Sequence, residues 1–350
     1  MFKDITVEEL VAEKDSGSYV IIDVRSPSEY REFCIPGSIN IPIFSDQERA
    51  EIGTLYKQVS VHAAKERGLE VVSAKLPEFV KEFAQLEKER IVYCWRGGMR
   101  SKTTATVLDL MGIHTHRLVG GIHDYRKWAV HRLESYPMHP EALVLNGYTG
   151  AGKTLILHQL ENEGYPVLDL ERMANHRGSI FGQIGLRPHN QKMFDALLLD
   201  RLDQLNGQPY VLFEAESKRI GKAVLPEFLT VKKENGFQLF IDMPIEERVQ
   251  HILDDYQPWG HHEECLSAFR KIQKRIHTPI AADITRHLEI GEFREAVELL
   301  LLYYYDPLYT HTAEQYPVDR RLTLRVKNTD DAVEQVKQIL QDQFHTVPLG

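Results

Sequence analysis

Two short loops in this sequence carry residue types that handle anions. In the first, one cysteine is followed by two glycines and two arginines, and the segment reads Cys94-Trp95-Arg96-Gly97-Gly98-Met99-Arg100-Ser101. The second has the full spacing of a P-loop and reads Gly147-Tyr148-Thr149-Gly150-Ala151-Gly152-Lys153-Thr154. A thiol held above backbone amides can carry a chalcogen, and a P-loop wraps a phosphate chain with amides and a lysine. Together the loops indicate sulfur or selenium chemistry coupled to a phosphorylated reactant.

The first loop, which we call the cysteine turn, is predicted to join a strand to a helix. Ile91-Val92-Tyr93 is an apolar run of strand length, and residues 101–111 have a helical pattern. Backbone N–H groups and the positive end of the helix dipole would then face the Cys94 sulfur and stabilise its thiolate. Arg96 and Arg100 add positive charge, so the turn is predicted to bind an anionic sulfur or selenium donor. The alternative is a buried structural cysteine beside an ordinary turn.

The remaining residues of the cysteine turn have predicted roles in the same site. Its glycines allow the backbone to approach an anion closely. Trp95 is a large aromatic residue at the mouth of the site, where it either stacks on a uracil ring or anchors the loop. The predicted donor-binding residues are Trp95, Arg96, Gly97, Gly98 and Arg100.

The P-loop has the sequence context that phosphate binding requires. The apolar run Ala142-Leu143-Val144-Leu145 precedes it as a predicted buried strand, and a predicted helix over residues 153–163 follows it. Lys153 can meet the outer phosphates, and the Thr154 hydroxyl can ligate Mg²⁺. The predicted phosphate-binding residues are Gly147, Gly150, Gly152, Lys153 and Thr154.

Further polar residues are predicted to surround the P-loop. Glu214 and Glu216 follow the predicted strand Tyr210-Val211-Leu212-Phe213, where nucleotide hydrolases usually carry an aspartate for Mg²⁺. Because a P-loop recognises phosphates and not a base, the sequence leaves open a nucleotide or an organic diphosphate that departs during group transfer. The basic candidates for phosphate or RNA contacts, with a solvated surface loop as the alternative, are Arg172, His176, Arg177 and Arg187.

Alternating strand and helix patterns must position these loops. An apolar strand is predicted at Tyr19-Val20-Ile21-Ile22-Asp23, and helical periodicity covers residues 75–88. After the P-loop, further strands are predicted at Val167-Leu168 and Phe237-Gln238-Leu239-Phe240-Ile241, a helix over residues 190–205, and mostly helix after residue 244. Such alternation predicts an α/β fold with parallel sheets. Prolines at 137 and 140 interrupt the pattern, so the predicted domains are residues 1–135 and 141–350.

The composition is that of an ordinary globular protein. The 350 residues exceed what one core usually serves, and no apolar run approaches the ~20 residues of a membrane span, so a cytoplasmic two-domain protein is predicted. Cys34, Cys94 and Cys265 are too widely spaced to indicate a disulfide framework or a zinc knuckle. The net charge of −9 argues against nonspecific coating of nucleic acid and leaves room for a local basic groove.

About the first 130 residues resemble the rhodanese family. Four landmarks occur in order, namely Ile22-Asp23-Val24-Arg25-Ser26-Pro27-Ser28-Glu29-Tyr30, Ile35-Pro36-Gly37-Ser38-Ile39-Asn40-Ile41-Pro42, the cysteine turn, and Gly120-Gly121-Ile122. The resemblance implies that Cys94 carries a persulfide or an analogous species. It also implies that Asp23 and Arg25 form a structural ion pair. Cys34 is interpreted as a small buried side chain and only secondarily as a resolving thiol.

The sequence predicts a rhodanese-like parallel-sheet domain followed by a P-loop NTPase-like α/β domain with a helical C-terminal part. This combination resembles the bacterial tRNA 2-selenouridine synthase family. Further matching stretches are Asp46-Gln47-Glu48-Arg49-Ala50-Glu51-Ile52-Gly53-Thr54-Leu55-Tyr56-Lys57 and Ala174-Asn175-His176-Arg177-Gly178-Ser179. The resemblance implies that wobble 2-thiouridine of tRNA becomes 2-selenouridine through an S-geranyl intermediate. It implies geranyl diphosphate and selenophosphate as co-substrates and no tightly bound cofactor. Mg²⁺ and a selenophosphate-producing enzyme are further candidate partners.

Two other functions remain open on the sequence. One is a sulfurtransferase fused to a P-loop kinase or ATPase that acts on a small metabolite. The other is a regulatory module that senses persulfide and nucleotide without turnover. Co-purification of RNA would favour the tRNA-modifying enzyme over the first, and multiple turnover would exclude the second.

Overall fold

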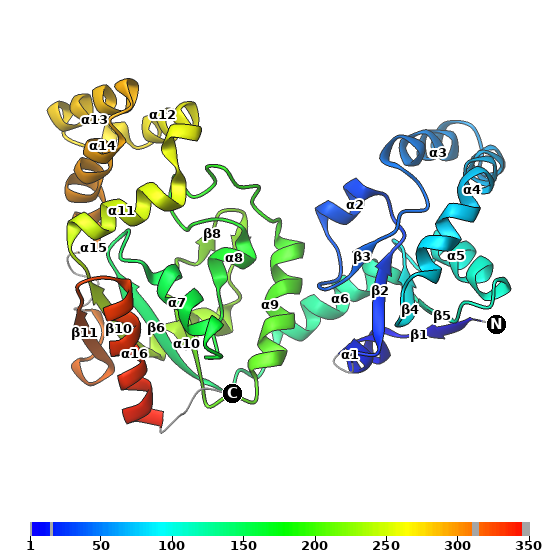
Figure 1. Ribbon diagram of the computed structural model, residues 1–350, viewed down its shortest axis with the longest axis horizontal. Helices are drawn as coiled ribbons and strands as arrows, with labels where there is room; N and C mark the ends of the chain where they lie inside the picture. Colours follow the sequence, from blue (N-terminus) through cyan, green and yellow to red (C-terminus); the bar gives the residue numbers. More distant parts are fainter. Residues whose placement is uncertain (1, 15–16, 310–314, 345–350) are drawn as a thin grey trace. The chain divides into compact units, whose positions relative to one another are not determined.

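The computed structural model divides the chain into two compact units, each with its own parallel sheet (Figure 1). The structure describes residues 2–14, 17–309 and 315–344. The first unit comprises Met1–Ser135 and Asp195–Leu199, and the second comprises Tyr136–Phe194 and Asp200–Gly350. Within the described residues, no helix is both long and apolar enough to cross a bilayer.

The first unit is built on five parallel strands in the order β1-β5-β4-β2-β3. The strands are β1 (Lys3–Ile5), β2 (Tyr19–Asp23), β3 (Ile39–Asn40), β4 (Glu89–Tyr93) and β5 (Thr115–Leu118). The helices are α1 (Val7–Lys14), α2 (Pro27–Glu32), α3 (Asp46–Gln58), α4 (Val61–Ala84), α5 (Met99–Leu110) and α6 (Gly121–Glu134). The predicted strands β2 and β4 are confirmed and lie side by side in the sheet.

Helices α4 and α5 cover one face of this sheet. Phe83 of α4 and Leu108 of α5 are fully buried against Ile22 and Val92 of the two central strands. The predicted helix over residues 75–88 corresponds to the second half of α4, which is 24 residues long. The cysteine turn follows the carboxyl end of β4 and ends in the first turn of α5.

The second unit has a four-stranded parallel sheet in the order β11-β10-β6-β7. Its strands are β6 (Glu141–Gly147), β7 (Tyr210–Glu214), β10 (Phe237–Asp242) and β11 (Arg321–Arg325), and a separate small hairpin joins β8 (Arg219–Ile220) and β9 (Ala223–Val224). The predicted strand at Val167-Leu168 takes the form of a single parallel bridge from Val167 to Leu212 beside β7. Strand β6 is central and runs directly into the P-loop.

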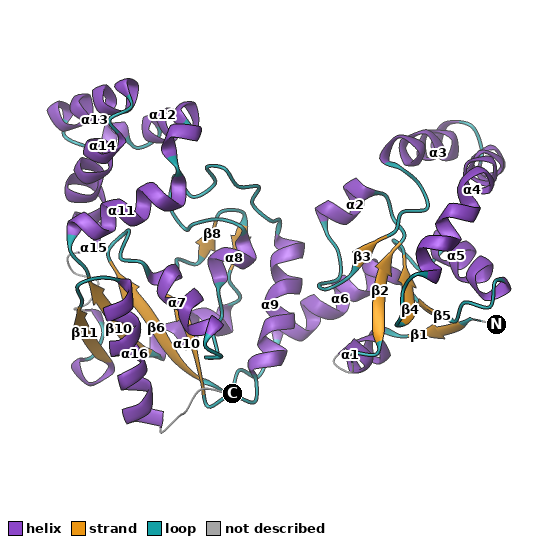
Figure 2. Cartoon of the chain, in the orientation of Figure 1, coloured by secondary structure: helices purple, strands orange, loops and turns teal. Residues whose placement is uncertain are grey.

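Helices cover this second sheet and extend beyond it (Figure 2). They are α7 (Lys153–Asn162), α8 (Leu170–Ala174), α9 (Gln191–Leu205), α10 (Glu227–Asn235), α11 (Ile245–Tyr256), α12 (His262–Arg270), α13 (Thr278–Ile290), α14 (Phe293–Leu300), α15 (Asp306–Tyr309) and α16 (Thr329–Phe344), with a π-helical turn at Leu301–Tyr305. Helices α7 and α16 pack on the sheet. Helices α12, α13 and α14 form a separate apolar cluster, which we call the helical extension. The prediction that the chain after residue 244 is mostly helical is confirmed, and β11 is the one strand among the described residues of that part.

Candidate functional site

The cysteine turn places Cys94 at the carboxyl end of β4, as predicted. The cysteine is 3% exposed, and its Sγ lies 3.2 Å from the Ser101 hydroxyl oxygen on the first turn of α5. Ser101 is fully buried, and its hydroxyl also donates to the Gly98 carbonyl at 3.4 Å. A hydrogen-bonding group on the helix therefore faces the sulfur.

Two glycines allow the chain to fold tightly around Cys94. Gly97 has φ +60°, and a Cβ atom there would lie 2.7 Å from the Leu118 carbonyl oxygen. Gly121 has φ +58°, and a Cβ atom there would collide with the Cys94 carbonyl oxygen. The Ile122 N–H donates to that same carbonyl at 2.9 Å. The Gly120-Gly121-Ile122 landmark therefore holds the cysteine turn through backbone contacts that any side chain would prevent.

The two arginines of the cysteine turn differ in their surroundings. Arg100 donates to both oxygens of Glu29, at 2.5 and 3.2 Å. Burial opposes the ionisation of Glu29, yet the ion pair with Arg100 lowers the pKa of this carboxyl below its ordinary value. Arg96 is exposed and has no hydrogen-bond or ion-pair partner among the described residues. Arg96 is therefore the cation of this turn that is free to meet an anionic ligand.

Arg117 of β5 is a further cation at the turn that the sequence did not reveal. It donates to the Gly97 carbonyl at 2.8 Å and to both oxygens of Asp4, at 2.7 and 2.6 Å. The hydrogen bonds to Asp4 raise the pKa of Arg117 despite partial burial. Trp95 is 39% exposed, with its ring 6.1 Å from that of His123, so it borders the turn and keeps an open face.

The structural ion pair expected of Asp23 and Arg25 is present. Both residues are almost completely buried, and Arg25 Nη2 lies 2.6 Å from Asp23 Oδ2. The same nitrogen donates to the Phe33 carbonyl. Cys34 is half-buried, and burial raises the pKa of its thiol, which keeps it protonated and weakens its candidacy as a resolving thiol.

The P-loop glycines are required by close backbone contacts. A Cβ atom at Gly147, φ +143°, would lie 2.7 Å from the Ile241 carbonyl of β10. A Cβ atom at Gly150, φ +81°, would lie 2.7 Å from the Arg248 carbonyl of α11. The Lys153 Nζ donates to the carbonyls of Gly147 and Tyr148, at 3.2 and 3.3 Å, so it lies within the loop. Burial lowers the pKa of Lys153, despite the neighbouring carboxylates.

Three glutamates, which we call the carboxylate cluster, line the cavity at the P-loop: Glu171, Glu214 and Glu216. The Thr154 hydroxyl donates to Glu171 Oε2 at 3.0 Å, and the Glu171 N–H donates to Glu214 Oε1 at 2.9 Å. Burial, together with the Glu216 charge, raises the pKa of Glu171 to about 8. Burial is also the main cause that raises the pKa values of Glu214 and Glu216. Glu171 was missed by the sequence analysis, although its place three residues after Leu168 was a usable signal.

The carboxylate cluster fits a bound cation by its chemistry. Glu214 is 1% exposed, and its Oε2 atom has no hydrogen-bond partner among the described residues. A hydroxyl and carboxylates are the ligands that Mg²⁺ prefers, and a buried carboxylate oxygen without a donor is stabilised by a positive charge. No described group of three or more histidine, cysteine or acidic residues has a ready-made arrangement for a metal ion. Thr154, Glu171 and Glu214 are therefore candidates that would need a ligand to complete the site.

The basic segment before α9 is brought only in part to the cavity. Arg177 lines it, donating to the Ile184 and Asp255 carbonyls at 2.8 Å each. The other three basic candidates do not line it. Arg172 pairs with Glu161 at 2.8 Å, His176 packs against Gly182 and Gly221 with its pKa lowered by burial, and the Arg187 side chain is exposed.

Gly178 links the basic segment to the carboxylate cluster. It has φ +62°, and a Cβ atom there would lie 2.7 Å from Glu171 Oε1 and would collide with the Glu216 carboxylate. The neighbouring Ser179 hydroxyl lies 2.9 Å from the Tyr256 hydroxyl of α11. Residues 177–179 therefore line the cavity next to the carboxylates.

The cavity extends from the P-loop to the chain after α11. Its volume is about 660 Å³, and its wall includes Tyr304, Tyr305 and Tyr309. An apolar crevice of about 60 Å³ adjoins it, because Thr149, Ser179, Ile252, Tyr256 and Tyr305 line both spaces. The rest of the crevice is lined mainly by apolar residues of the helical extension and its surroundings, including Phe181, Leu288, Phe293, Val297 and Leu300. A phosphate cradle and a hydrocarbon surface therefore meet in one unit.

Arg248 fastens the P-loop to the end of the helical part and was also missed by the sequence analysis. It is 4% exposed, its Nε donates to the Thr149 carbonyl at 2.9 Å, and its guanidinium pairs with Asp306 at 2.5 Å. The guanidinium also lies 4.9 Å from the centre of the Tyr148 ring. The loop conformation therefore depends on residues about a hundred positions further along the chain.

Comparison with known proteins agrees with the fold of both units. A family model described as a rhodanese-like domain matches residues 6–127, and one described as a tRNA 2-selenouridine synthase AAA domain matches residues 140–346. The tRNA 2-selenouridine synthase of Bdellovibrio bacteriovorus is 31% identical, over 88% of this chain and 92% of its own length. Those of Nitrosomonas europaea and Pseudomonas fluorescens are 30% and 32% identical, over 89% and 84% of this chain and 93% and 88% of their own lengths. The chain belongs to the tRNA 2-selenouridine synthase family.

Proposed function

We propose that this protein converts wobble 2-thiouridine of tRNA to 2-selenouridine in two steps, geranyl transfer at the P-loop and selenium transfer at the cysteine turn. The observation that carries the proposal is the cavity of about 660 Å³ at the P-loop, which has tyrosines in its wall and adjoins an apolar crevice. A nucleotide needs hydrogen-bonding groups for its base and ribose, whereas an isoprenoid diphosphate needs a phosphate cradle next to a hydrocarbon surface. The adjoining cavity and crevice supply that second combination.

The first step is geranyl transfer from geranyl diphosphate. The thiouridine sulfur attacks the allylic carbon, the carbon–oxygen bond breaks, and its electron pair leaves with the diphosphate while the N3 proton of the base passes to water. Lys153 and the P-loop amides stabilise the charge that develops on the diphosphate. A Mg²⁺ ion held by Thr154 and the carboxylate cluster would neutralise part of the same charge.

The second step replaces the geranylated sulfur by selenium. The selenium of hydrogen selenophosphate adds to C2 of the base, the carbon–sulfur bond breaks, and geranylthiol leaves with the proton. Water then cleaves the selenium–phosphorus bond and gives 2-selenouridine and hydrogen phosphate, so no oxidant or reductant is needed. We assign to Cys94 and Arg96 the steering of the donor, because a bond from Cys94 sulfur to selenium would require an oxidant. An enzyme that produces selenophosphate is the partner that this step implies.

The proposal is tested on an anticodon stem-loop RNA with 2-thiouridine at the wobble position. The full chain is incubated with geranyl diphosphate, then with selenophosphate, and the nucleosides are separated and weighed by mass spectrometry. The S-geranyl nucleoside is expected after the first addition and 2-selenouridine after the second. Absence of both products, together with phosphate transfer from ATP to a small metabolite, would replace the proposal with the sulfurtransferase–kinase alternative.

A further inference from the structure

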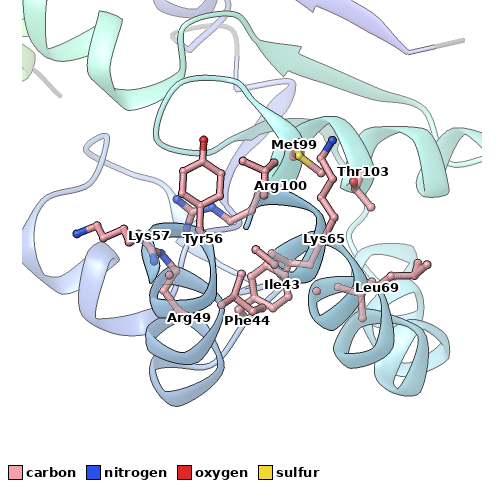
Figure 3. A pocket seen from close by; sticks show the side chains of 16 residues that line it. Ile43, Phe44, Arg49, Tyr56, Lys57, Lys65, Leu69, Met99, Arg100 and Thr103 are labelled. Carbon is pink, nitrogen blue, oxygen red and sulfur yellow. The ribbon is translucent and has the colours of Figure 1, made fainter. Parts of the chain in front are cut away.

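The first unit contains an apolar pocket that the two proposed steps leave without a role. It has a volume of about 590 Å³ and lies between α3, α4 and α5 (Figure 3). Its floor includes Phe44 and Val72, which belong to the core of the unit. Its volume is within the range of about 300–1,000 Å³ that small-molecule pockets have.

Large apolar side chains surround the mouth of this pocket and are exposed to solvent. Tyr56 of α3 is 61% exposed, Leu69 of α4 is 71% exposed and Met99 of α5 is 59% exposed. Figure 3 shows these three side chains around the pocket, each from a different helix. Exposed apolar residues that converge on one hollow indicate that it receives an apolar group.

The rim of the pocket is positively charged. Lys57 and Lys65 are exposed and have no ion-pair or hydrogen-bond partner among the described residues. Arg49 also lines the pocket, with Glu29 at 3.6 Å. An apolar floor below free lysines matches an apolar chain that is carried by a polyanion, because the chain can enter while the phosphates meet the rim.

The pocket borders the cysteine turn itself. Met99, Arg100 and Thr103 of α5 line it. Ser101, on the same helical turn as Met99 and Arg100, is the residue whose hydroxyl lies 3.2 Å from Cys94 Sγ. The α5 side of the pocket therefore lies on the same helical turn as the residue that contacts Cys94.

We propose that this pocket binds the geranyl chain of S-geranyl-2-thiouridine in tRNA while the base is presented to Cys94. The assignment rests on the proposed function and deepens it, since it names how the rhodanese-like unit distinguishes the geranylated RNA from its 2-thiouridine precursor. The same pocket would hold the hydrocarbon part of the leaving geranylthiol. The RNA phosphates on either side of the wobble base would meet Lys57 and Lys65.

Gly68 of α4 offers a direct test. Its missing side chain faces the pocket, since a Cβ atom there would make ordinary contacts with Phe44 at 3.6 Å and Ile52 at 3.9 Å. Gly68→Leu would fill the pocket, and leucine favours a helix more than glycine does. Ala74→Leu, at an exposed position of the same helix outside the pocket, is the matched control. Leu69→Gln at the exposed mouth is a second variant, which leaves the core untouched and adds no charge.

Binding is measured by fluorescence anisotropy on the full chain, with stem-loop RNAs that carry S-geranyl- or S-methyl-2-thiouridine. We expect wild type and Ala74→Leu to bind the S-geranyl RNA about 10-fold or more tightly than the S-methyl RNA, as burial of several CH₂ groups predicts. Gly68→Leu and Leu69→Gln should remove this preference and leave binding of the S-methyl RNA within about 2-fold. A preference that survives both substitutions would overturn the pocket assignment.

The test separates the pocket from the proposed function. A wild-type protein that makes no S-geranyl nucleoside from geranyl diphosphate breaks the proposed function, whatever the binding preference. A protein that makes both products, with Gly68→Leu selenating S-geranyl RNA as fast as wild type at limiting RNA, breaks only the pocket assignment. If Gly68→Leu lost geranyl transfer from geranyl diphosphate, the pocket would serve the diphosphate substrate. This result would also overturn the pocket assignment.

Discussion

The cysteine turn and the P-loop are both glycine-rich loops at the carboxyl end of a central parallel strand, yet their electrostatic surroundings are opposite. At the cysteine turn, Arg100 is paired with Glu29 and Arg117 with Asp4. At the P-loop, burial lowers the pKa of Lys153 while burial and mutual repulsion raise the pKa values of the three carboxyls of the carboxylate cluster. The first loop keeps one cation, Arg96, without a partner among the described residues, whereas at the second Lys153 lies beside the three carboxyls of the cluster.

The two loops therefore place different requirements on the charge of a ligand. An anion that reaches the cysteine turn meets backbone amides and the unpaired Arg96, so it needs no companion. A polyanion at the P-loop meets one lysine beside several buried carboxyls, which must be protonated or neutralised by a cation. We therefore expect geranyl transfer to depend on pH and on divalent cations more strongly than selenium transfer does.

Among the substitutions that would separate the functions of the two loops, Cys94→Ala is expected to have the largest effect. Because Cys94 is assigned to steering the selenium donor in the second step only, selenation should fall roughly 10³-fold or more, while geranyl transfer stays within about 2-fold of wild type. Mass analysis of the RNA nucleosides measures both. Cys34→Ala is the matched control and should keep both activities. Normal selenation by Cys94→Ala would refute the assignment.

The reciprocal substitution is Lys153→Ala. Removing this charge from the diphosphate site should slow geranyl transfer by about 10²–10³-fold, the size of effect of one lost donor to a developing negative charge. Selenation of RNA that already carries the S-geranyl group should remain near wild type. Lys222→Ala, an exposed lysine outside the cavity, serves as control. If both activities fell together, the two loops would not be separate sites.

A smaller effect is expected for Gly178→Ala. The added methyl group meets the carboxylates of Glu171 and Glu216 at a left-handed backbone position, so the variant should lose about 1–3 kcal/mol of stability. Geranyl transfer should fall about 10-fold or more, because the carboxylates must move. Gly207→Ala, where no atom lies within 4 Å, should change stability by less than about 0.5 kcal/mol. Urea denaturation measures the stability, and equal values for the two variants would contradict the packing described here.

The last effect concerns stability and not activity: we expect a pH-dependent gain in thermal stability for Glu171→Gln. The pKa of Glu171 is about 8 in the folded protein against an ordinary value of 4.5, so folding favours the protonated form. The resulting stabilisation is present below pH 4.5 and is lost as the pH rises through 8. The melting temperature of the variant minus that of wild type should therefore increase from pH 4.5 to pH 8 and level off above pH 8. Each kcal/mol of stability difference corresponds to about 2–4 °C.

Scanning calorimetry between pH 5 and pH 9, with no divalent cation present, measures this difference. Glu298→Gln, an exposed glutamate of α14, is the control and should follow wild type at every pH. A difference that is constant with pH would mean that Glu171 is ionised in the folded protein. Added Mg²⁺ should narrow the difference if the carboxylate cluster holds a cation.

Local patterns predicted the elements that carry both loops, because those elements are short, apolar and bounded by glycine. The strand before Cys94 and the strand before Gly147 are buried on both faces, so their apolar runs stand out. Strand β11 could not be found in this way, since only Leu324 of its residues is buried and it lies at the edge of the sheet. These residues form a strand because they pair with β10, and a local sequence pattern does not reveal such pairing.

The site residues that escaped prediction act across long separations. Arg117 reaches the cysteine turn only through the pairing of β5 with β4, and Arg248 reaches the P-loop from α11. The motif also did not reveal that Arg100 would be neutralised by Glu29, 71 positions away. Spacing within a motif specifies backbone geometry, whereas the charge that a ligand meets depends on contacts made by the tertiary fold.

The contact of Arg248 with Asp306 has a practical consequence for dissecting the protein. A fragment that stops before residue 306 would retain every letter of the P-loop motif and the whole of α11, yet it would leave an almost fully enclosed guanidinium without its counter-ion. Stranding one member of such a pair typically costs about 3–5 kcal/mol. A truncation designed from the motif alone would therefore remove the ion pair that supports the P-loop. The inactivity of such a fragment would say little about the role of the loop itself.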